Sequence, residues 1–138
     1  RRWACAGPAI VWRGMMYRTG LRRRLSAMHF FDVDGPEGEV HSHPYVVELV
    51  ATGEELDDNG YLVDLDTMAI ALEDALGRLE GKVLNDLPEF SGSPPSVESL
   101  ARVIWGMTAA RLPAAKWVSV KVWESDDAWA SNGMRTDG

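Results

Sequence analysis

The chain has 138 residues, 46% of them apolar, which favours one domain with a substantial core. Its net charge of −7 argues against a nucleic-acid-binding protein, because such proteins present a basic face. The single cysteine, Cys5, excludes an intramolecular disulfide and fits a reducing compartment, so we expect a cytoplasmic protein.

The N-terminal segment combines two arginines with a short apolar patch, a pattern that loosely resembles a secretory signal. A glycine and a proline interrupt the patch, and no apolar run in the chain approaches the roughly 20 residues of a membrane span. We therefore interpret Met15 or Met16 as the natural start. Residues 1–15 are then an N-terminal extension and residues 16–138 form a single domain.

Two runs of alternating residues predict an antiparallel pair of strands at the start of this domain. The first covers residues 16–31 and places His29 on the same face as neighbouring apolar residues. An acidic, glycine-rich loop at 32–39 follows, and the second strand covers 43–53. We interpret the arginines at 22–24 as part of a solvated edge strand, with an anion-binding strand as the alternative.

Two amphipathic helices are predicted next. The first has Asp64 or Asp66 as its N-cap and carries an apolar stripe that ends near two glycines. A loop at 82–95 separates it from the second helix, which begins with Ser96 as N-cap and ends before Pro113. Both stripes indicate packing against a core.

The last predicted strand covers residues 117–124, and a short segment at 128–130 adds to the sheet edge. Glu124 has the parity of the apolar face of this strand, where an unpaired buried carboxylate is costly. It is therefore either paired or exposed at the strand end, or it binds a ligand. Strands grouped apart from helices indicate an α+β fold, in which an antiparallel sheet carries two helices on one face. The uncovered face favours self-association.

The three histidines are the strongest chemical signal in the chain. His41 and His43 leave a strand on the same face, and the antiparallel pairing can bring His29 beside them. Three imidazoles with an open fourth position are typical of a catalytic zinc site, although iron, nickel or copper would also accept them. Glu37 lies four residues before His41. It is a candidate general base, with a solvated loop acid as the alternative.

Six segments together resemble, in order, motifs of the 6-pyruvoyl tetrahydropterin synthase / 6-carboxytetrahydropterin synthase family. The resemblance covers roughly residues 16–131, and only the histidine pattern is specific on its own. The segments are LSAMH at 25–29, HSHPY at 41–45, GYLVD at 60–64, LND at 84–86, PSVESLA at 95–101 and VWES at 122–125.

This resemblance implies the T-fold, a four-stranded antiparallel sheet with two helices in the order ββααββ, assembled into homo-trimers or homo-hexamers with active sites at subunit interfaces. It implies Zn²⁺ bound by His29, His41 and His43. It also implies that Glu124 anchors a pterin ring with Ser96 nearby. The expected substrate is 7,8-dihydroneopterin triphosphate or a related dihydropterin, and no nucleic acid or membrane is expected as a partner.

The chain departs from the family pattern at two places. Glu37 stands where the family usually has a catalytic cysteine, and some members are thought to use a glutamate there. The family's L-D-H motif is Leu79-Glu80-Gly81 here, so an Asp-His relay cannot operate in its usual form. We expect a zinc-dependent lyase similar to 6-carboxytetrahydropterin synthase. The alternatives are a 6-pyruvoyl tetrahydropterin synthase, a glutamate-dependent cleavage of the dihydroneopterin side chain, and a pterin-binding protein without turnover.

Overall fold

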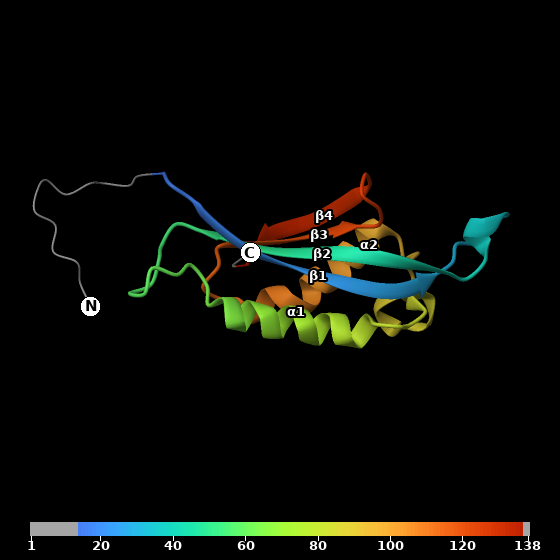
Figure 1. Ribbon diagram of the computed structural model, residues 1–138, viewed down its shortest axis with the longest axis horizontal. Coiled ribbons are helices and arrows are strands. Elements are labelled where there is room, and N and C mark those ends of the chain that lie inside the picture. Colours follow the sequence, from blue (N-terminus) through green and yellow to red (C-terminus); the bar gives the residue numbers. More distant parts are fainter. Residues whose placement is uncertain (1–13, 137–138) are drawn as a thin grey trace, which may run out of the picture.

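The computed structural model describes residues 14–136, and its strands and α-helices follow in the predicted order ββααββ (Figure 1). Residues 1–13 of the expected N-terminal extension lie outside the described residues. The elements are β1 (Tyr17–His29), β2 (His41–Gly53), α1 (Leu65–Leu79), α2 (Val97–Thr108), β3 (Trp117–Trp123) and β4 (Trp129–Arg135).

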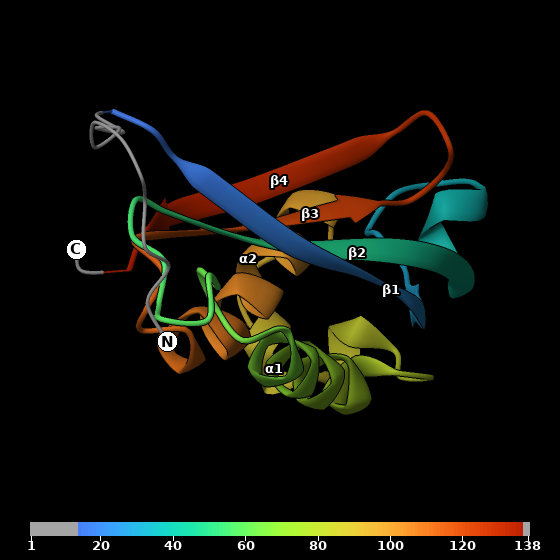
Figure 2. The same ribbon diagram turned by 60° about the vertical axis from the view of Figure 1, so that its left-hand side comes forward.

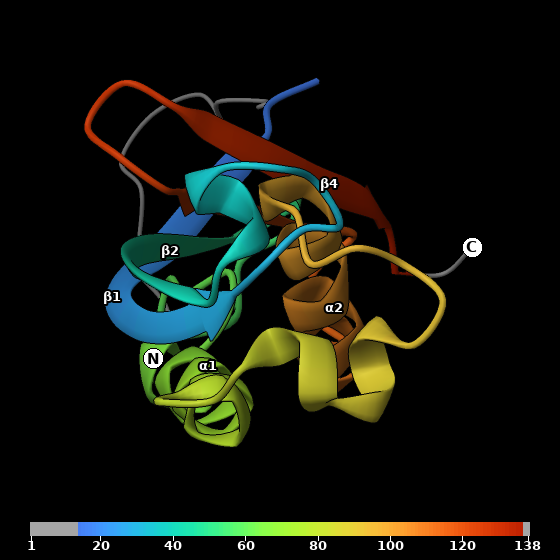
Figure 3. The ribbon, with the colours of Figure 1, turned by 90° about the vertical axis from the view of Figure 1, so that its right-hand side faces the viewer.

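The four strands form one antiparallel sheet in the order β1-β2-β3-β4. Both α-helices cover the same face of this sheet (Figure 2), and the end-on view of Figure 3 shows them beneath it. Helix α1 contacts β1, whereas α2 contacts β3 and β4. The predicted α+β class, with an antiparallel sheet and two helices on one face, is therefore confirmed. Among the described residues, no helix is long and apolar enough to cross a bilayer.

The core lies between the sheet and the two helices. Because side chains alternate along a strand, β2 directs Tyr45, Val47 and Leu49 to the helices, and each is at most 1% exposed. The apolar stripe of α1 places Met68 and Leu72 against them at 0% exposure. Each such fully buried side chain contributes roughly 1.5–3 kcal/mol relative to an exposed one. This packing fixes the face from which the histidines project.

The structure corrects several predicted boundaries. Strand β2 begins at His41 rather than at residue 43, because His41 pairs directly with His29. In place of the predicted short segment 128–130, a seven-residue strand, β4, begins at Trp129 and pairs along all of β3. The loop 82–95 contains two 3-10 turns, at Leu84–Asp86 and Pro88–Phe90.

The helix ends follow local side-chain chemistry. The side chain of Asp64, not that of Asp66, caps α1 by accepting the Asp66 N–H at 2.8 Å. Ser96 caps α2 as predicted, and its hydroxyl accepts the Ser99 N–H at 3.1 Å. Helix α1 continues past Gly77 and ends before Gly81, which has a φ of +70° that favours glycine.

Candidate metal centre and adjoining pocket

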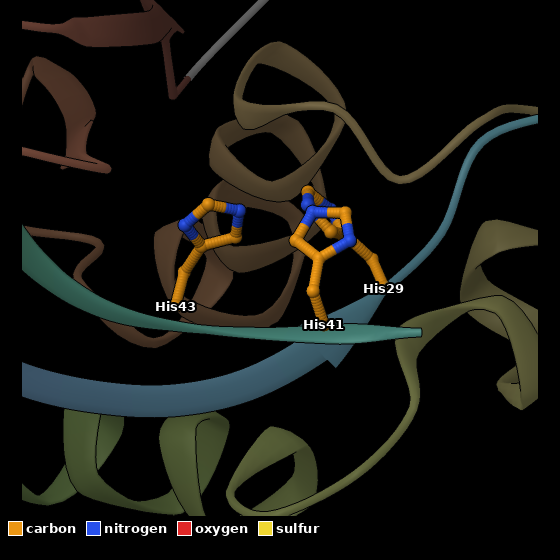
Figure 4. A group of neighbouring side chains, drawn as sticks. All are labelled: His29, His41 and His43. Carbon is orange, nitrogen blue, oxygen red and sulfur yellow. The ribbon is translucent and has the colours of Figure 1, made fainter. Parts of the chain in front are cut away.

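The three histidines converge at one end of the sheet, where β1 ends and β2 begins (Figure 4). The strand register places His29 opposite His41 and Ala27 opposite His43, so all three imidazoles lie on one face. One ring nitrogen from each histidine lies within 4.8 Å of those of the other two. The three histidines therefore lie together, as the sequence predicted.

Hydrogen bonds to the backbone orient two of these rings. His29 Nδ1 donates to the Pro95 carbonyl at 2.7 Å, and His41 Nδ1 donates to the Glu39 carbonyl at the same distance. A carbonyl can only accept, so each Nδ1 carries the proton and each Nε2 presents a lone pair. Both Nε2 atoms are buried and make no hydrogen bond with the described residues. Buried lone pairs with this support are what a metal ion requires.

The electrostatics favour neutral imidazole at the centre. Burial lowers the pKa of His29 below its ordinary value, and the nearby His43 and His41 add to this effect. The bond to the Pro95 carbonyl acts in the opposite direction but is the smaller influence. A neutral ring binds a metal ion without first losing a proton, so the site suits a divalent cation.

Glu37 reaches the same centre from the loop between β1 and β2. It occupies a 3-10 turn at Pro36–Gly38, and its Oε2 lies 3.4 Å from His41 Nε2 without hydrogen-bond geometry. The Phe31 N–H donates to the Glu37 carbonyl at 2.8 Å, which ties the turn to the end of β1. The side chain itself is 64% exposed. It is therefore free to contact a molecule bound in front of the histidines.

A pocket of about 620 Å³ is lined by two of the three histidines and by the other predicted site residues. This volume is in the usual range for small-molecule sites. Among the residues that line it are carboxylates but no lysine or arginine. The lining residues are His29, Phe31, Glu37, His43, Ser96, Val97, Glu98, Glu124 and Ser125.

Glu124 and Ser96 differ in how far they are free to bind a ligand. Glu124 is half-buried just beyond the end of β3, and no side-chain bond ties its carboxylate to the described residues. The Ser96 hydroxyl accepts the Ser99 N–H and donates to Ser99 Oγ at 3.2 Å. Ser96 therefore has a structural role as the cap of α2, and its contact with a substrate stays a prediction.

The sequence analysis did not identify two groups that lie beside the three histidines. The Pro95 carbonyl is a backbone atom, and nothing in the sequence marks it as the acceptor for His29. Tyr45 is 1% exposed, and its hydroxyl oxygen lies 3.4 Å from His29 Nδ1. Burial, and then the charge of Glu124, raises the pKa of Tyr45, so it remains protonated. The sequence did carry one signal for Tyr45: it lies two residues after His43, which places both side chains on the same face of the strand.

Glu80 has a different role from the acid of an Asp-His relay. Its carboxylate accepts the Ser26 N–H at 2.9 Å, and the next residue, Gly81, donates its N–H to the Ser26 carbonyl at 2.8 Å. These bonds attach the end of α1 to β1. Glu80 is not among the residues that line the pocket of the histidines.

Comparison with known proteins identifies a family. Residues 20–133 match the family model described as 6-pyruvoyl tetrahydropterin synthase. A 6-carboxy-5,6,7,8-tetrahydropterin synthase from Bacillus subtilis (strain 168) is 33% identical in a 94-residue alignment that covers 64% of this chain and 62% of that relative. The chain thus matches less than two thirds of the length of this curated relative.

Solved structures share the fold at low sequence identity. A Caenorhabditis elegans 6-pyruvoyl tetrahydropterin synthase is 16% identical with a TM-score of 0.76, over 88% of this chain and 98% of that one. A Plasmodium vivax 6-pyruvoyltetrahydropterin synthase, in which a catalytic glutamate is replaced by alanine, is 14% identical. Its TM-score is 0.72 over 88% of this chain and 99% of that one. The expected T-fold is therefore confirmed.

Proposed function

This chain belongs to the 6-pyruvoyl tetrahydropterin synthase family, and we propose that it is a zinc-dependent tetrahydropterin synthase of the lyase class. The proposed substrate is 7,8-dihydroneopterin triphosphate or a closely related dihydropterin, with a product like that of the 6-carboxytetrahydropterin synthase it is similar to. One observation carries the proposal: three imidazoles converge, those of His29 and His41 with buried, unbonded Nε2 atoms, beside a pocket that Glu37 and Glu124 also line.

We assign the metal ligands to His29, His41 and His43. Three neutral imidazoles leave a fourth position for substrate, which is the usual composition of a catalytic zinc site. When bound there, zinc would polarise a substrate hydroxyl or carbonyl and make the adjacent C–H more acidic. The backbone carbonyls that hold the Nδ1 atoms of His29 and His41 would keep both rings oriented for this ion.

Glu124 is proposed to anchor the pterin ring. The amino-pyrimidinone edge of a pterin presents two N–H donors side by side, and a carboxylate accepts such a pair through its two oxygens. Glu124 lies in the lining of the same pocket as His29 and His43. A ring held by Glu124 would therefore extend its side chain towards the histidines.

Glu37 is proposed to be the general base. Its carboxylate is close to the metal centre and largely exposed to the pocket, so it could accept a proton from a substrate carbon. A glutamate is likewise the catalytic residue in the Plasmodium vivax synthase, which supports a carboxylate in this role. The proton relay of this chain would then begin at Glu37 without a cysteine.

We further propose assembly into a homo-trimer or homo-hexamer with active sites at subunit interfaces. Strands β1 and β4 are the two edges of the described sheet. Residues 81–83 cover the end of β1 at Ser26 and Met28, and the rest of that edge and the edge of β4 present backbone donors and acceptors to another strand. Pairing between copies would close the sheet, and sedimentation analysis of the purified chain would measure the number of copies.

The test combines turnover with two binding measurements. The zinc-loaded chain is incubated with 7,8-dihydroneopterin triphosphate and the products are followed by mass spectrometry, while zinc and pterin affinities are measured separately. We expect Glu37→Ala to lower the rate roughly 10²–10⁴-fold, the usual contribution of a general base, and to leave zinc bound. Asp34→Ala, an exposed acid in the same loop, is the matched control and should behave like the unmodified chain.

Each alternative result has a distinct meaning. Retained pterin binding with no product from the unmodified chain would overturn the lyase and favour a pterin-binding protein. If the unmodified chain binds neither zinc nor the pterin, the assignment of the site is wrong. Full turnover in Glu37→Ala would remove Glu37 from the mechanism but leave the lyase standing.

A further inference from the structure

We propose that Asn85 is a positioning residue for the metal centre. In this proposal its side-chain amide fixes the two peptide groups on either side of Phe30, which join the proposed metal ligand His29 to the loop of the candidate base Glu37. The inference rests on the proposed function, since it concerns how that site is held in shape. Asn85 does not line the pocket, so it would act only through the backbone of β1.

Asn85 makes a closed pair of hydrogen bonds with one residue. The Phe30 N–H donates to Asn85 Oδ1 at 3.0 Å, and Asn85 Nδ2 donates to the Phe30 carbonyl at 2.9 Å. An amide side chain presents a donor and an acceptor side by side, as a neighbouring strand would. Aspartate lacks the donor, so it could make only one of the two bonds at this length.

The position of Phe30 explains why such a pair is needed. Strand β1 ends at His29, and β2 begins with its partner His41, so Phe30 lies beyond the sheet ladder. Its N–H and carbonyl are only partly exposed, and such groups are costly when left unpaired. Asn85 supplies the partners that no strand provides there.

The backbone of Phe30 that Asn85 fixes lies between two parts of the proposed site. His29 precedes Phe30 and presents its buried Nε2 to the centre. Phe31 follows, and its N–H donates to the Glu37 carbonyl at 2.8 Å. A rotation about the backbone of Phe30 would therefore change the placement of the proposed ligand relative to the turn that carries the candidate base. In this proposal the Asn85 side chain thereby sets the distance between His29 and the turn that carries Glu37.

Asn85 is itself held by rigid neighbours. It follows Leu84, which is 0% exposed in the core, and both lie in the 3-10 turn Leu84–Asp86. Just before this turn, the Met28 N–H donates to the Lys82 carbonyl at 2.9 Å, and Met28 forms a parallel bridge with Val83. The segment thus runs alongside the end of β1 like a short additional strand. The position of Asn85 relative to β1 is therefore fixed.

The experiment compares Asn85→Ala and Asn85→Asp with Asp86→Ala, an exposed neighbour on the same turn. Co²⁺ is the probe, because its visible spectrum reports ligand geometry at saturation without any turnover. In both Asn85 variants we expect an altered spectrum and roughly ten-fold weaker Co²⁺ binding, the lower end of the effect of supporting residues. We also expect kcat to fall about ten-fold with KM almost unchanged, since Glu124 would still hold the ring. Amide hydrogen exchange at Phe30 and Phe31 should accelerate.

The outcomes separate this inference from the proposed function. Co²⁺ spectra and affinities like those of the unmodified chain in both variants would overturn the positioning role, even if thermal stability fell. If Asn85→Ala fails to fold, Asn85→Asp decides alone, because it keeps the size and the bond from the Phe30 N–H. If the unmodified chain binds no Co²⁺, the proposed metal site and this inference fall together. If it binds Co²⁺ but does not turn over, the spectra still test Asn85.

Discussion

Replacing Ser96 with alanine separates a structural from a substrate-binding role for this residue. The Ser96 hydroxyl accepts the Ser99 N–H at 3.1 Å, and no earlier turn of α2 exists to supply another acceptor. Ser99 is 8% exposed, so water cannot readily replace the lost bond. Ser99 Oγ keeps its contact with Ser93 Oγ at 3.0 Å, so the hydroxyl of Ser99 is not stranded.

The expected magnitude follows from that single bond. Loss of an N-cap costs about 1 kcal/mol, and a buried donor left without a partner costs about 1–3 kcal/mol. Both figures describe the same N–H, so they are not added. Ser96→Ala should therefore lower the free energy of unfolding by about 1–2 kcal/mol. For a chain of 138 residues this shifts Tm down by roughly 3–8 °C.

Thermal and urea unfolding followed by circular dichroism measure this change. Ser96→Asp should restore most of the stability, because aspartate is an equally good N-cap and its charge favours a helix N-terminus. Ser91→Ala, at an exposed position of the same loop, is the control. Unchanged stability in Ser96→Ala, or no recovery in Ser96→Asp, would refute the capping argument. Pterin affinity measured on the stable Ser96→Asp variant then tests the predicted substrate contact separately.

Two further predictions concern the pocket and its protonation. Glu124→Gln should weaken pterin binding roughly 10–100-fold, because hydrogen bonds to a charged group contribute about 1.5–3 kcal/mol. The affinity for Co²⁺ should not change. Calorimetric titration measures both affinities, and weakened Co²⁺ binding would contradict the assigned roles. The lowered pKa of His29 means that the unfolded chain binds its proton more readily than the folded chain. The free energy of unfolding of the metal-free chain should therefore be highest above the ordinary pKa of 6.5 and should decline as the pH falls below it. Urea midpoints that rise on acidification would contradict this prediction.

Alternation was sufficient to predict most of the histidine cluster. Because side chains repeat every two residues along a strand, the spacing of His41 and His43 placed both on one face. The antiparallel pairing then brought His29 opposite His41. The polar end of β4 was harder to predict, since Ser131, Asn132 and Gly133 give no apolar alternation, and its length follows from pairing with β3.

The contacts that orient the site could not be predicted in the same way. The acceptor of His29 is the carbonyl of Pro95, 66 residues further along the chain, and every residue type carries such a carbonyl. The bonds between Asn85 and Phe30 likewise depend on how the segment after α1 folds back on β1. Local pattern does not encode these long-range placements, which arise only when the core packs.

The proposed metal ligands and the candidate base are supported by different parts of the fold. The histidines stand on strands whose other residues fill the core, so their positions are set by packing. Glu37 instead stands on a turn closed by backbone bonds from Gly38 to Gly35 and from Glu39 to Pro36. A Cβ atom at Gly38 would overlap the Val33 carbonyl oxygen, so this turn requires glycine there. The turn is thus shaped by its own bonds, and two contacts tie it to the strands: the Phe31 N–H donates to the Glu37 carbonyl, and His41 Nδ1 donates to the Glu39 carbonyl. A change of the Glu37 side chain should therefore affect proton transfer before metal binding, whereas a change that displaces the Glu39 carbonyl should affect both.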